Sequence, residues 1–524
     1  MEPAESSRRY NAAVDLVDRH VAEGRGARIS YIDDIGTHTY ADLARRSDAA
    51  GRMLLSLGVV PEQRVLLVMV DTFELPALFL GAMKVGAVPV LLNTMLRAAD
   101  YAHFTRDSRA PVLVVSDALV PMIDAALADR PATLQHVLVA RSPLPSEPSA
   151  HDALGPLLDA ATGPLPLADT TPDDVAFWLY SSGSTGAPKA AVHLHAHLMR
   201  TVELYARPVL GIGPDDVVFS AAKLFFAYGL GHALTFPLAV GATAVLTAER
   251  PTPAVVARTM RKHQPTIFYG VPTLFAALLA DADIEAHGLS PRLRVSTSAG
   301  EGLPRHVGEA WRARWGSDIL DGIGSTELLH IFLSNRPGDV RYGTTGRPVP
   351  GYELELRDER GHVVPDGVEG SLWVRGRTAC VGYFNQRDKS LATFHGEWTR
   401  TGDHYVRDAE GYYTYCGRAD DMLKVGGIWV SPFEVESALG RHAAVLEAAV
   451  VGWVDHDQLV KPKAFVVLRI SIESKDARDD LERELKDFVK AALANYKYPR
   501  WVEFVTELPK TATGKIQRFK LRQS

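Results

Sequence analysis

A run of small and hydroxyl-bearing residues in the first half of the sequence has the composition of a phosphate-binding loop. It reads Tyr-Ser-Ser-Gly-Ser-Thr-Gly-Ala-Pro-Lys over residues 180–189 and directly follows the apolar run 175–179. Glycines let backbone N–H groups approach phosphate oxygens, hydroxyls add donors, and Lys189 adds a full positive charge. The Walker order Gly-Lys-Ser/Thr is absent, which disfavours a kinase-like or GTPase-like loop. The segment predicts a polyphosphate site; a flexible Ser/Gly surface loop is the alternative that composition alone leaves open.

Four further segments carry groups suited to the same chemistry. They are Asp-Gly-Ile-Gly-Ser-Thr-Glu over 321–327, Thr-Gly-Asp over 401–403, Gly-Arg-Ala-Asp-Asp over 417–421 leading into Lys-Val-Gly-Gly over 424–427, and Pro-Lys-Thr-Ala-Thr-Gly-Lys-Ile-Gln-Arg over 509–518. In this order and spacing, the motifs resemble those of the AMP-forming acyl and aryl CoA ligases, the superfamily that also holds peptide-synthetase adenylation domains and luciferases. The resemblance covers essentially the whole chain.

This resemblance implies a reaction in two half-reactions. A carboxylate resists attack by a thiol because it is anionic and has no leaving group. Its oxygen would first attack the α-phosphorus of ATP, releasing pyrophosphate and forming an acyl-adenylate; a thiol would then displace AMP to give a thioester. Both transition states carry anionic oxygens, so cations and N–H donors should dominate the rate. The implied cofactors are ATP, Mg²⁺ and coenzyme A, or the phosphopantetheine of a carrier protein in place of coenzyme A.

The resemblance also assigns residues to the nucleotide. The β- and γ-phosphates and the departing pyrophosphate would be held by Ser181, Ser182, Gly183, Ser184, Thr185, Gly186 and Lys189. Thr326 would contact the α-phosphate, and Glu327 would hold Mg²⁺, a hard cation that suits a carboxylate and phosphate oxygens. The adenosine would be lined by Ser298, Ala299, Gly300, Asp321, Gly322, Ile323, Asp403 and Arg418.

The C-terminal motif matters most for catalysis. Lys515 resembles the adenylation lysine, which bridges the carboxylate and the α-phosphate; outside its motif, a lysine this close to the chain end would be a solvated side chain. Asp420 occupies the position of the family's hinge, which predicts domains of residues 1–419 and 420–524. Gly426 and Gly427 would line the thiol tunnel. Relatives commonly have Ser at the position of Gly426, and the two adjacent glycines would loosen that loop.

The segment Lys-Leu-Phe-Phe-Ala-Tyr-Gly-Leu-Gly over 223–231 bears on the identity of the acid. Together with the motif residues after Glu327, it is similar to benzoate-CoA ligases, and it implies a flat, mostly apolar slot for an aromatic ring. The residues that would form this slot are Phe226, Ala227, Tyr228, Gly324, His330 and Ile331. The segment lacks the acidic residue with which amino-acid-activating relatives pair the α-amino group, so an amino-acid substrate is disfavoured. Some of these aromatics, Phe225 included, would simply fill the core.

Other questions stay open at this stage. His232 stands where benzoate-CoA ligases tend to have Asn. The ring substituents that the slot accepts depend on differences in binding free energy of only about 1 to 3 kcal/mol between related acids, which the sequence does not settle. A second function is loading of the aryl group onto a discrete acyl carrier protein, and a third is non-catalytic nucleotide binding, which the intact motifs disfavour. A metal site at His193, His195 and His197 is disfavoured because the ligand set is incomplete.

The elements between the motifs predict how they are positioned. Short apolar runs at 65–70, 111–115, 136–140, 175–180, 243–246 and 266–269 alternate with helical patterns. One helix has a capping box at Thr39 and Asp42 and ends at Gly58. The sequence therefore predicts an α/β fold: a large N-terminal domain of parallel sheets with covering helices and a small antiparallel β unit after residue 350, followed by a small mobile α+β C-terminal domain. The Pro-rich stretch 142–166 is predicted to be a surface connection.

Composition narrows the class of protein further. The 524 residues carry 57 basic and 63 acidic side chains, a formal net charge of −6, which gives no electrostatic footprint for nucleic acid or an anionic membrane surface. Two cysteines cannot build a disulfide framework, and neither a signal peptide nor a membrane span is predicted, so a reducing cytoplasm is expected. A homodimer is expected only by analogy with the family.

Overall fold

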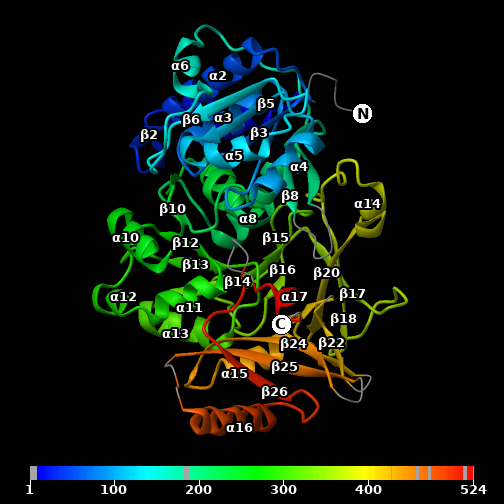
Figure 1. The fold of residues 1–524 in the computed structure, drawn as a ribbon. Coiled ribbons are helices and arrows are strands. Elements are labelled where there is room, and N and C mark those ends of the chain that lie inside the picture. Colours follow the sequence, from blue (N-terminus) through cyan, green and yellow to red (C-terminus); the bar gives the residue numbers. More distant parts are fainter. Residues whose placement is uncertain are drawn as a thin grey trace.

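Two large, mainly parallel sheets form the bulk of the molecule (Figure 1). The structure is a computed structural model that describes residues 9–181, 188–419, 421–425, 428–455, 459–469, 472, 474–510 and 516–522. Buried side chains from both sheets, such as Leu67, Val218 and Ala244, belong to one continuous hydrophobic cluster that also holds the helices between the sheets. The sheets are thus fixed relative to each other by a shared core.

The seven-stranded sheet carries the predicted phosphate loop at one edge. Its strands, in spatial order, are β7 (Asp152–Ala153), β6 (His136–Ala140), β5 (Val112–Ser116), β3 (Arg64–Val68), β4 (Val88–Leu91), β8 (Val175–Ser181) and β9 (Lys189–Leu194). All neighbours are parallel except β8 and β9, which form an antiparallel pair. Buried Val and Leu residues dominate the central strands, as expected for a sheet covered on both faces.

The nine-stranded sheet carries the 321–327 motif. Its strands, in spatial order, are β16 (Arg347–Pro348), β15 (Ile331–Ser334), β14 (Asp318–Gly324), β13 (Val295–Ser298), β12 (Ile267–Gly270), β10 (Val217–Ser220), β11 (Thr243–Val245), β1 (Ile29–Ile32) and β2 (Thr37–Thr39). The strands from β14 to β1 are parallel, and antiparallel strands close both edges.

Helices cover both sheets (Figure 1). On the seven-stranded sheet lie α2 (Tyr40–Ser56), α3 (Glu74–Lys84), α4 (Ala98–Ser108), η3 (Asp117–Leu119), α5 (Val120–Ala126) and α6 (Leu154–Ala160). On the nine-stranded sheet lie α10 (Pro253–His263), α11 (Pro272–Ala280), α12 (Ala282–His287) and α13 (Arg305–Trp315). The remaining helical segments of this part are η2 (Val14–Asp18), α1 (Arg19–Ala22), α7 (His195–Thr201), η4 (Val202–Leu210), α8 (Ala227–Leu230), η5 (Gly231–Thr235) and α9 (Phe236–Val240).

The rest of the chain forms an antiparallel sheet and a small C-terminal unit. The sheet contains β17 (Glu353–Arg357), β18 (Glu369–Arg375), β19 (Phe394–His395), β20 (Trp398–Arg407) and β21 (Tyr413–Arg418), with α14 (Arg387–Thr393) beside it. The C-terminal unit contains the hairpin β22 (Leu423–Val425) and β23 (Ile428–Val430), the sheet of β24 (Val445–Val454), β25 (Val460–Leu468) and β26 (Trp501–Val505), and α15 (Pro432–Leu439), α16 (Lys475–Ala492) and α17 (Arg518–Leu521).

The predicted fold class is confirmed, with local differences. Thr39 and Asp42 form the capping box of α2, and Gly58 follows the helix with φ 77°. The stretch 142–166 is more than a connection, because it contains β7 and α6, whose Leu154 and Leu158 are buried one helical turn apart. In α16 the buried face consists of Leu481, Leu485 and Val489. None of the described helices is both long and apolar enough to cross a bilayer.

Candidate active site

The predicted phosphate loop connects two antiparallel strands. Ser181 ends β8, Lys189 begins β9, and the two residues are paired in register. This hairpin differs from a Walker loop, which leads from a strand into a helix. The loop residues Ser182, Gly183, Ser184, Thr185 and Gly186 lie outside the described residues, whereas Ser181 and Lys189 at the two ends of the hairpin lie within them.

Lys189 and Glu327 come from different sheets and lie side by side. Lys189 Nζ is 3.9 Å from Glu327 Oε1, and both side chains are largely buried. Ser181 Oγ donates to the same carboxylate oxygen at 3.3 Å. Burial lowers the pKa of Lys189, while the neighbouring Glu327 carboxylate opposes that effect. The structure therefore brings together a cation, a carboxylate and a hydroxyl of the predicted phosphate site.

A third side chain, which the sequence analysis did not predict, lies between these two charges. Tyr383 donates its hydroxyl hydrogen to Glu327 Oε1 at 2.7 Å and accepts a hydrogen bond from Lys189 Nζ at 3.1 Å. The Lys189 ammonium also lies 4.4 Å from the centroid of the Tyr383 ring. The only sequence signal for this residue is its Gly-Tyr-Phe context, which by itself is typical of a turn or a strand end.

The turn that carries Thr326 and Glu327 follows β14 and is held through its backbone. His193 Nε2 lies 2.8 Å from the Thr326 carbonyl oxygen, and the Glu327 carbonyl accepts from the Cys380 amide at 2.7 Å. Leu329 has φ 65°, a left-handed conformation unusual for a bulky residue and one that appears where surrounding contacts over-determine the backbone. The turn is thus fixed by contacts from β9 and from the segment around Cys380.

The three histidines that follow the phosphate loop have structural partners. His193 lies in β9, while His195 and His197 lie in α7 and are buried with it. His193 Nδ1 is 3.2 Å from His197 Nδ1, and His195 Nδ1 accepts from the Ala12 amide at 3.2 Å. Among the described residues, no group of three or more His, Cys, Asp or Glu side chains has the arrangement of a metal site.

The residues predicted to contact adenosine lie at the ends of neighbouring strands. Ser298 of β13 is paired with Asp321 of β14 in the parallel register, with Gly322 and Ile323 next along β14. Ala299 is buried, and Gly300 follows it with φ 99°. Burial raises the pKa of Asp321 well above its usual range. Parallel strands present their carboxyl ends at one edge, which is where α/β folds bind nucleotides.

Asp403 and Arg418 face each other from β20 and β21. The two residues are register partners, and Arg418 Nη1 lies 3.2 Å from Asp403 Oδ1. Arg418 Nη1 also donates to the Thr401 carbonyl at 3.1 Å. Gly402 has φ 78°, and a Cβ there would lie 3.0 Å from the Arg418 guanidinium, so this turn needs a glycine. The carboxylate and guanidinium are therefore held on one side of the antiparallel sheet.

The predicted aromatic slot is formed by two segments that are far apart in the sequence. Tyr228 of α8 stacks on His330 with the ring centroids 6.1 Å apart, and its hydroxyl is 2.6 Å from Thr297 Oγ1 of β13. Gly324 is paired with Ile331, and a Cβ on Gly324 would lie 2.5 Å from the His330 carbonyl oxygen. Phe226 and Ala227 are half-buried at the start of α8, whereas Phe225 is buried, as expected of a core residue.

His232 belongs to the same aromatic cluster. Its ring stacks on Tyr269 at 3.6 Å and packs edge-on to Tyr228 at 4.3 Å and to His330 at 4.6 Å. The ring nitrogens of His232 and His330 have no hydrogen-bond partner among the described residues. Burial lowers the pKa of both, for His330 to about 3, so both rings are neutral. A polar but uncharged wall therefore closes one side of the slot.

The C-terminal motif is described only at its two ends. Lys515, Asp420, Gly426 and Gly427 lie outside the described residues. Lys510 and Ile516 pair across the base of the loop, and the Ile516 amide donates to Glu301 Oε1 at 3.0 Å. Arg518 donates to both carboxylate oxygens of Glu436, at 2.9 and 2.8 Å. The loop base is therefore attached both to the C-terminal unit and to the residue after Gly300.

Comparison with known proteins agrees with this arrangement. Residues 18–384 match the model of the AMP-binding enzyme family, and residues 434–515 match the model of the AMP-binding enzyme C-terminal domain. A benzoate–CoA ligase of Thauera aromatica is 57% identical, over 98% of this chain and 96% of its own length. Among solved structures, a benzoate CoA ligase from Burkholderia xenovorans LB400 is 53% identical with a TM-score of 0.90, covering 98% of this chain and 100% of its own. The anthranilate CoA ligase AuaEII in complex with anthranoyl-AMP is 42% identical with a TM-score of 0.93, covering 98% and 97%. The chain belongs to the family of AMP-binding, adenylate-forming enzymes.

Proposed function

We propose that the protein converts benzoate, or a closely related aromatic carboxylic acid, to its acyl-adenylate with ATP and then transfers the acyl group to coenzyme A. The products are aryl-CoA, AMP and pyrophosphate. One observation carries this proposal: the single segment 324–331 contributes Glu327 beside Lys189 and His330 beside Tyr228. An acid bound in the slot would thus have its carboxylate next to the phosphate-binding groups.

The roles of the residues follow from their chemistry. Lys189 supplies positive charge to the phosphates that leave as pyrophosphate, and Thr326 adds a hydroxyl donor at the α-phosphate. Lys515 neutralises the charge that develops between the attacking carboxylate and that phosphate. Asp403 and Arg418 bind the ribose. Ser298, Ala299, Gly300, Asp321, Gly322 and Ile323 surround the adenine, and Ser181 to Gly186 surround the β- and γ-phosphates.

The surroundings of the Glu327 carboxylate suit the binding of a magnesium ion. This carboxylate accepts hydrogen bonds from two hydroxyl groups, those of Tyr383 and Ser181, and carboxylate oxygens are ligands of the kind that Mg²⁺ prefers. When bound with ATP, Mg²⁺ would neutralise phosphate charge. Glu327 is the residue that would hold it, and the remaining ligands would be phosphate oxygens and water.

The C-terminal unit would act in both half-reactions. Asp420 is the proposed hinge between domains of residues 1–419 and 420–524, and Gly426 and Gly427 line the path of the thiol. Rotation about such a hinge exchanges the Lys515 loop for the glycine loop between the two steps. The similar relatives named above are CoA ligases, which favours coenzyme A over a carrier protein as the acceptor.

Two measurements test the proposal. Pyrophosphate release should depend on benzoate or a hydroxybenzoate, and AMP release should then depend on coenzyme A; no acid-dependent pyrophosphate release across such a panel would refute the proposal. Lys515→Ala should abolish adenylate formation but spare thioester formation from supplied benzoyl-adenylate. Lys510→Ala is the matched control, because this lysine at the base of the same loop pairs with Glu447 at 2.6 Å. Equal loss of both half-reactions in Lys515→Ala would contradict the role given to it.

A further inference from the structure

The Tyr383 hydroxyl occupies the space between the two opposite charges of the phosphate site. It lies 2.7 Å from Glu327 Oε1 and 3.1 Å from Lys189 Nζ, while those two atoms are 3.9 Å from each other. A direct ion pair between a lysine and a carboxylate has N···O distances of about 2.7–2.9 Å. The hydroxyl thus takes the place of a direct contact, with one hydrogen bond to each charge.

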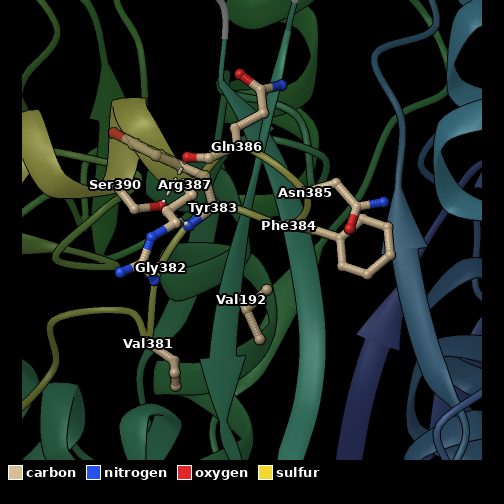
Figure 2. A pocket seen from close by; sticks show the side chains of 9 residues that line it. All are labelled: Val192, Val381, Gly382, Tyr383, Phe384, Asn385, Gln386, Arg387 and Ser390. Carbon is tan, nitrogen blue, oxygen red and sulfur yellow. Dashed lines mark hydrogen bonds between the residues drawn. The ribbon is translucent and has the colours of Figure 1, made fainter.

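Tyr383 is held by strand pairing rather than by its side chain alone. Residues 380–384, here called the clasp segment, run along β9. The Val381 amide donates to the Val192 carbonyl, and the Phe384 amide donates to the Ala190 carbonyl, both at 2.9 Å. The Tyr383 amide donates to Ser390 Oγ at 2.9 Å, a bond drawn in Figure 2. At its other end, the clasp segment reaches the Glu327 carbonyl through the Cys380 amide.

A surface cavity of about 460 Å³ lies against the clasp segment. Figure 2 shows its lining, in which Val192 of β9 faces residues 381–387 and Ser390. The cavity contacts none of the residues to which we assign ATP or the aromatic acid. The clasp segment is therefore a thin partition that has solvent-accessible space on one side and the phosphate site on the other, and backbone hydrogen bonds to β9 and to the Glu327 turn hold it in position.

The charges explain why such a spacer is useful. With the Lys189 and Glu327 side chains only 19% and 16% exposed, water would weaken a direct ion pair much less than it does at the surface. That pair would compete with the phosphates for the lysine and with a divalent cation for the carboxylate. The Tyr383 hydroxyl donates to the carboxylate and accepts from the ammonium, so it satisfies both groups while it keeps them apart.

We propose that Tyr383 is a positioning residue for adenylate formation. Its hydroxyl separates Lys189 from Glu327, so that the lysine stays available to phosphate and the carboxylate stays available to Mg²⁺. The inference rests on the proposed function, because it takes the roles of those two residues from it. The hydroxyl does not touch the aromatic acid and takes no part in thioester formation.

The test is Tyr383→Phe, which removes the hydroxyl and keeps the ring on which the Lys189 ammonium lies. Binding of Mn²⁺ as a paramagnetic probe for Mg²⁺, with a non-hydrolysable α,β-methylene ATP, should weaken by about tenfold or more, as expected for a hydrogen bond to a charged group. Adenylate formation should slow by a similar factor. The KM for benzoate and the rate of thioester formation from supplied benzoyl-adenylate should change by less than about twofold, since neither needs pyrophosphate contacts.

Tyr342→Phe is the matched control. Its hydroxyl also donates to a carboxylate, Asp318 Oδ1 at 2.9 Å, but it packs between α13 and β14 away from the phosphate site. Unchanged Mn²⁺ binding in Tyr383→Phe, or equal loss of both half-reactions, would overturn the inference. Glu327→Gln distinguishes failure of this inference from failure of the proposed function. If Mn²⁺ binding weakens in Glu327→Gln but not in Tyr383→Phe, only the inference about Tyr383 is overturned. Unchanged Mn²⁺ binding in Glu327→Gln overturns the metal-binding role itself.

Discussion

Lowering the pH from 7.5 to 5.5 should destabilise the folded protein, because the five buried histidines of β9, α7 and the aromatic slot are neutral in the folded state. They are His193, His195, His197, His232 and His330, each at most 2% exposed. Burial lowers the pKa to about 4 for His193 and His195, to about 2 for His197 and to about 3 for His330. For His232 it lowers the pKa well below the usual range.

The sign of the effect follows from proton linkage. These rings are neutral in the folded state over this pH range, whereas in the unfolded chain they titrate near 6.5. Their contribution to stability is therefore present above that pH and lost as the pH falls towards the folded-state values. Relative to pH 7.5, each ring lowers the free energy of unfolding at pH 5.5 by about 1.4 kcal/mol, and the five together lower it by about 7 kcal/mol.

Two buried carboxylates oppose this loss. Burial raises the pKa of Asp71 to about 6 and that of Asp321 well above its usual range, so each favours folding as the pH falls. Together they raise the free energy of unfolding by about 1 to 4 kcal/mol over the same two pH units, since a single group contributes at most about 1.4 kcal/mol per pH unit. The contribution of the histidines is the larger one, so the net loss in the free energy of unfolding should be about 3 to 6 kcal/mol.

Urea unfolding followed by tryptophan fluorescence at pH 7.5, 6.5 and 5.5 measures this loss. The midpoint should fall over the whole range, most steeply below pH 6.5, and unfolding at pH 5.5 should take up about three protons. His195→Asn removes one buried imidazole away from the proposed site and should reduce the uptake by about one proton. A midpoint that is constant or rises between pH 7.5 and 5.5 would refute the reasoning.

Three further substitutions have defined outcomes. His193→Phe keeps a ring stacked on Phe177, 5.2 Å away, but removes the donor to the Thr326 carbonyl; the KM for ATP should rise about five- to tenfold, with partial recovery in His193→Gln. Glu301→Ala removes the acceptor for the amide next to Lys515 and should slow adenylate formation by a similar factor, with thioester formation from supplied adenylate unchanged as the internal control. Arg518→Leu leaves its buried carboxylate partner unpaired and should cost the C-terminal unit about 3 to 5 kcal/mol in urea unfolding; a change below about 1 kcal/mol would contradict this.

Regular elements were predictable because their signals are local. The apolar run 136–140 coincides with β6, and the capping box at Thr39 and Asp42 begins α2 as expected. The motif segments could likewise be found one by one, because each needs particular residue types at adjacent positions. The structure brings Lys189 next to Glu327 and Tyr228 next to His330, and the chemistry of the motifs made both pairings reasonable expectations.

Contacts between distant segments were not predictable. Tyr383 lies 194 positions from Lys189 and 56 from Glu327, and no local pattern distinguishes it from other tyrosines near a turn. Its role depends on how the clasp segment pairs with β9, which is a tertiary property. The helix α6 was missed for a related reason: its two buried leucines lie in a stretch whose prolines and small residues are typical of loops.

The position of the clasp segment in the sequence, relative to the slot residues, has a consequence for protein engineering. The slot residues lie between positions 226 and 331, whereas the clasp segment lies after them and pairs with a strand that lies before them. An exchange of residues 226–331 with a relative of different acid preference would therefore leave Lys189 and Tyr383 in place and replace Glu327 by its counterpart. The same exchange would also replace the residues proposed to surround the adenine and Thr326, so substrate range and part of the nucleotide site would move together. Each hybrid must then keep the contacts that the residue at position 327 makes with Tyr383, Lys189 and Ser181.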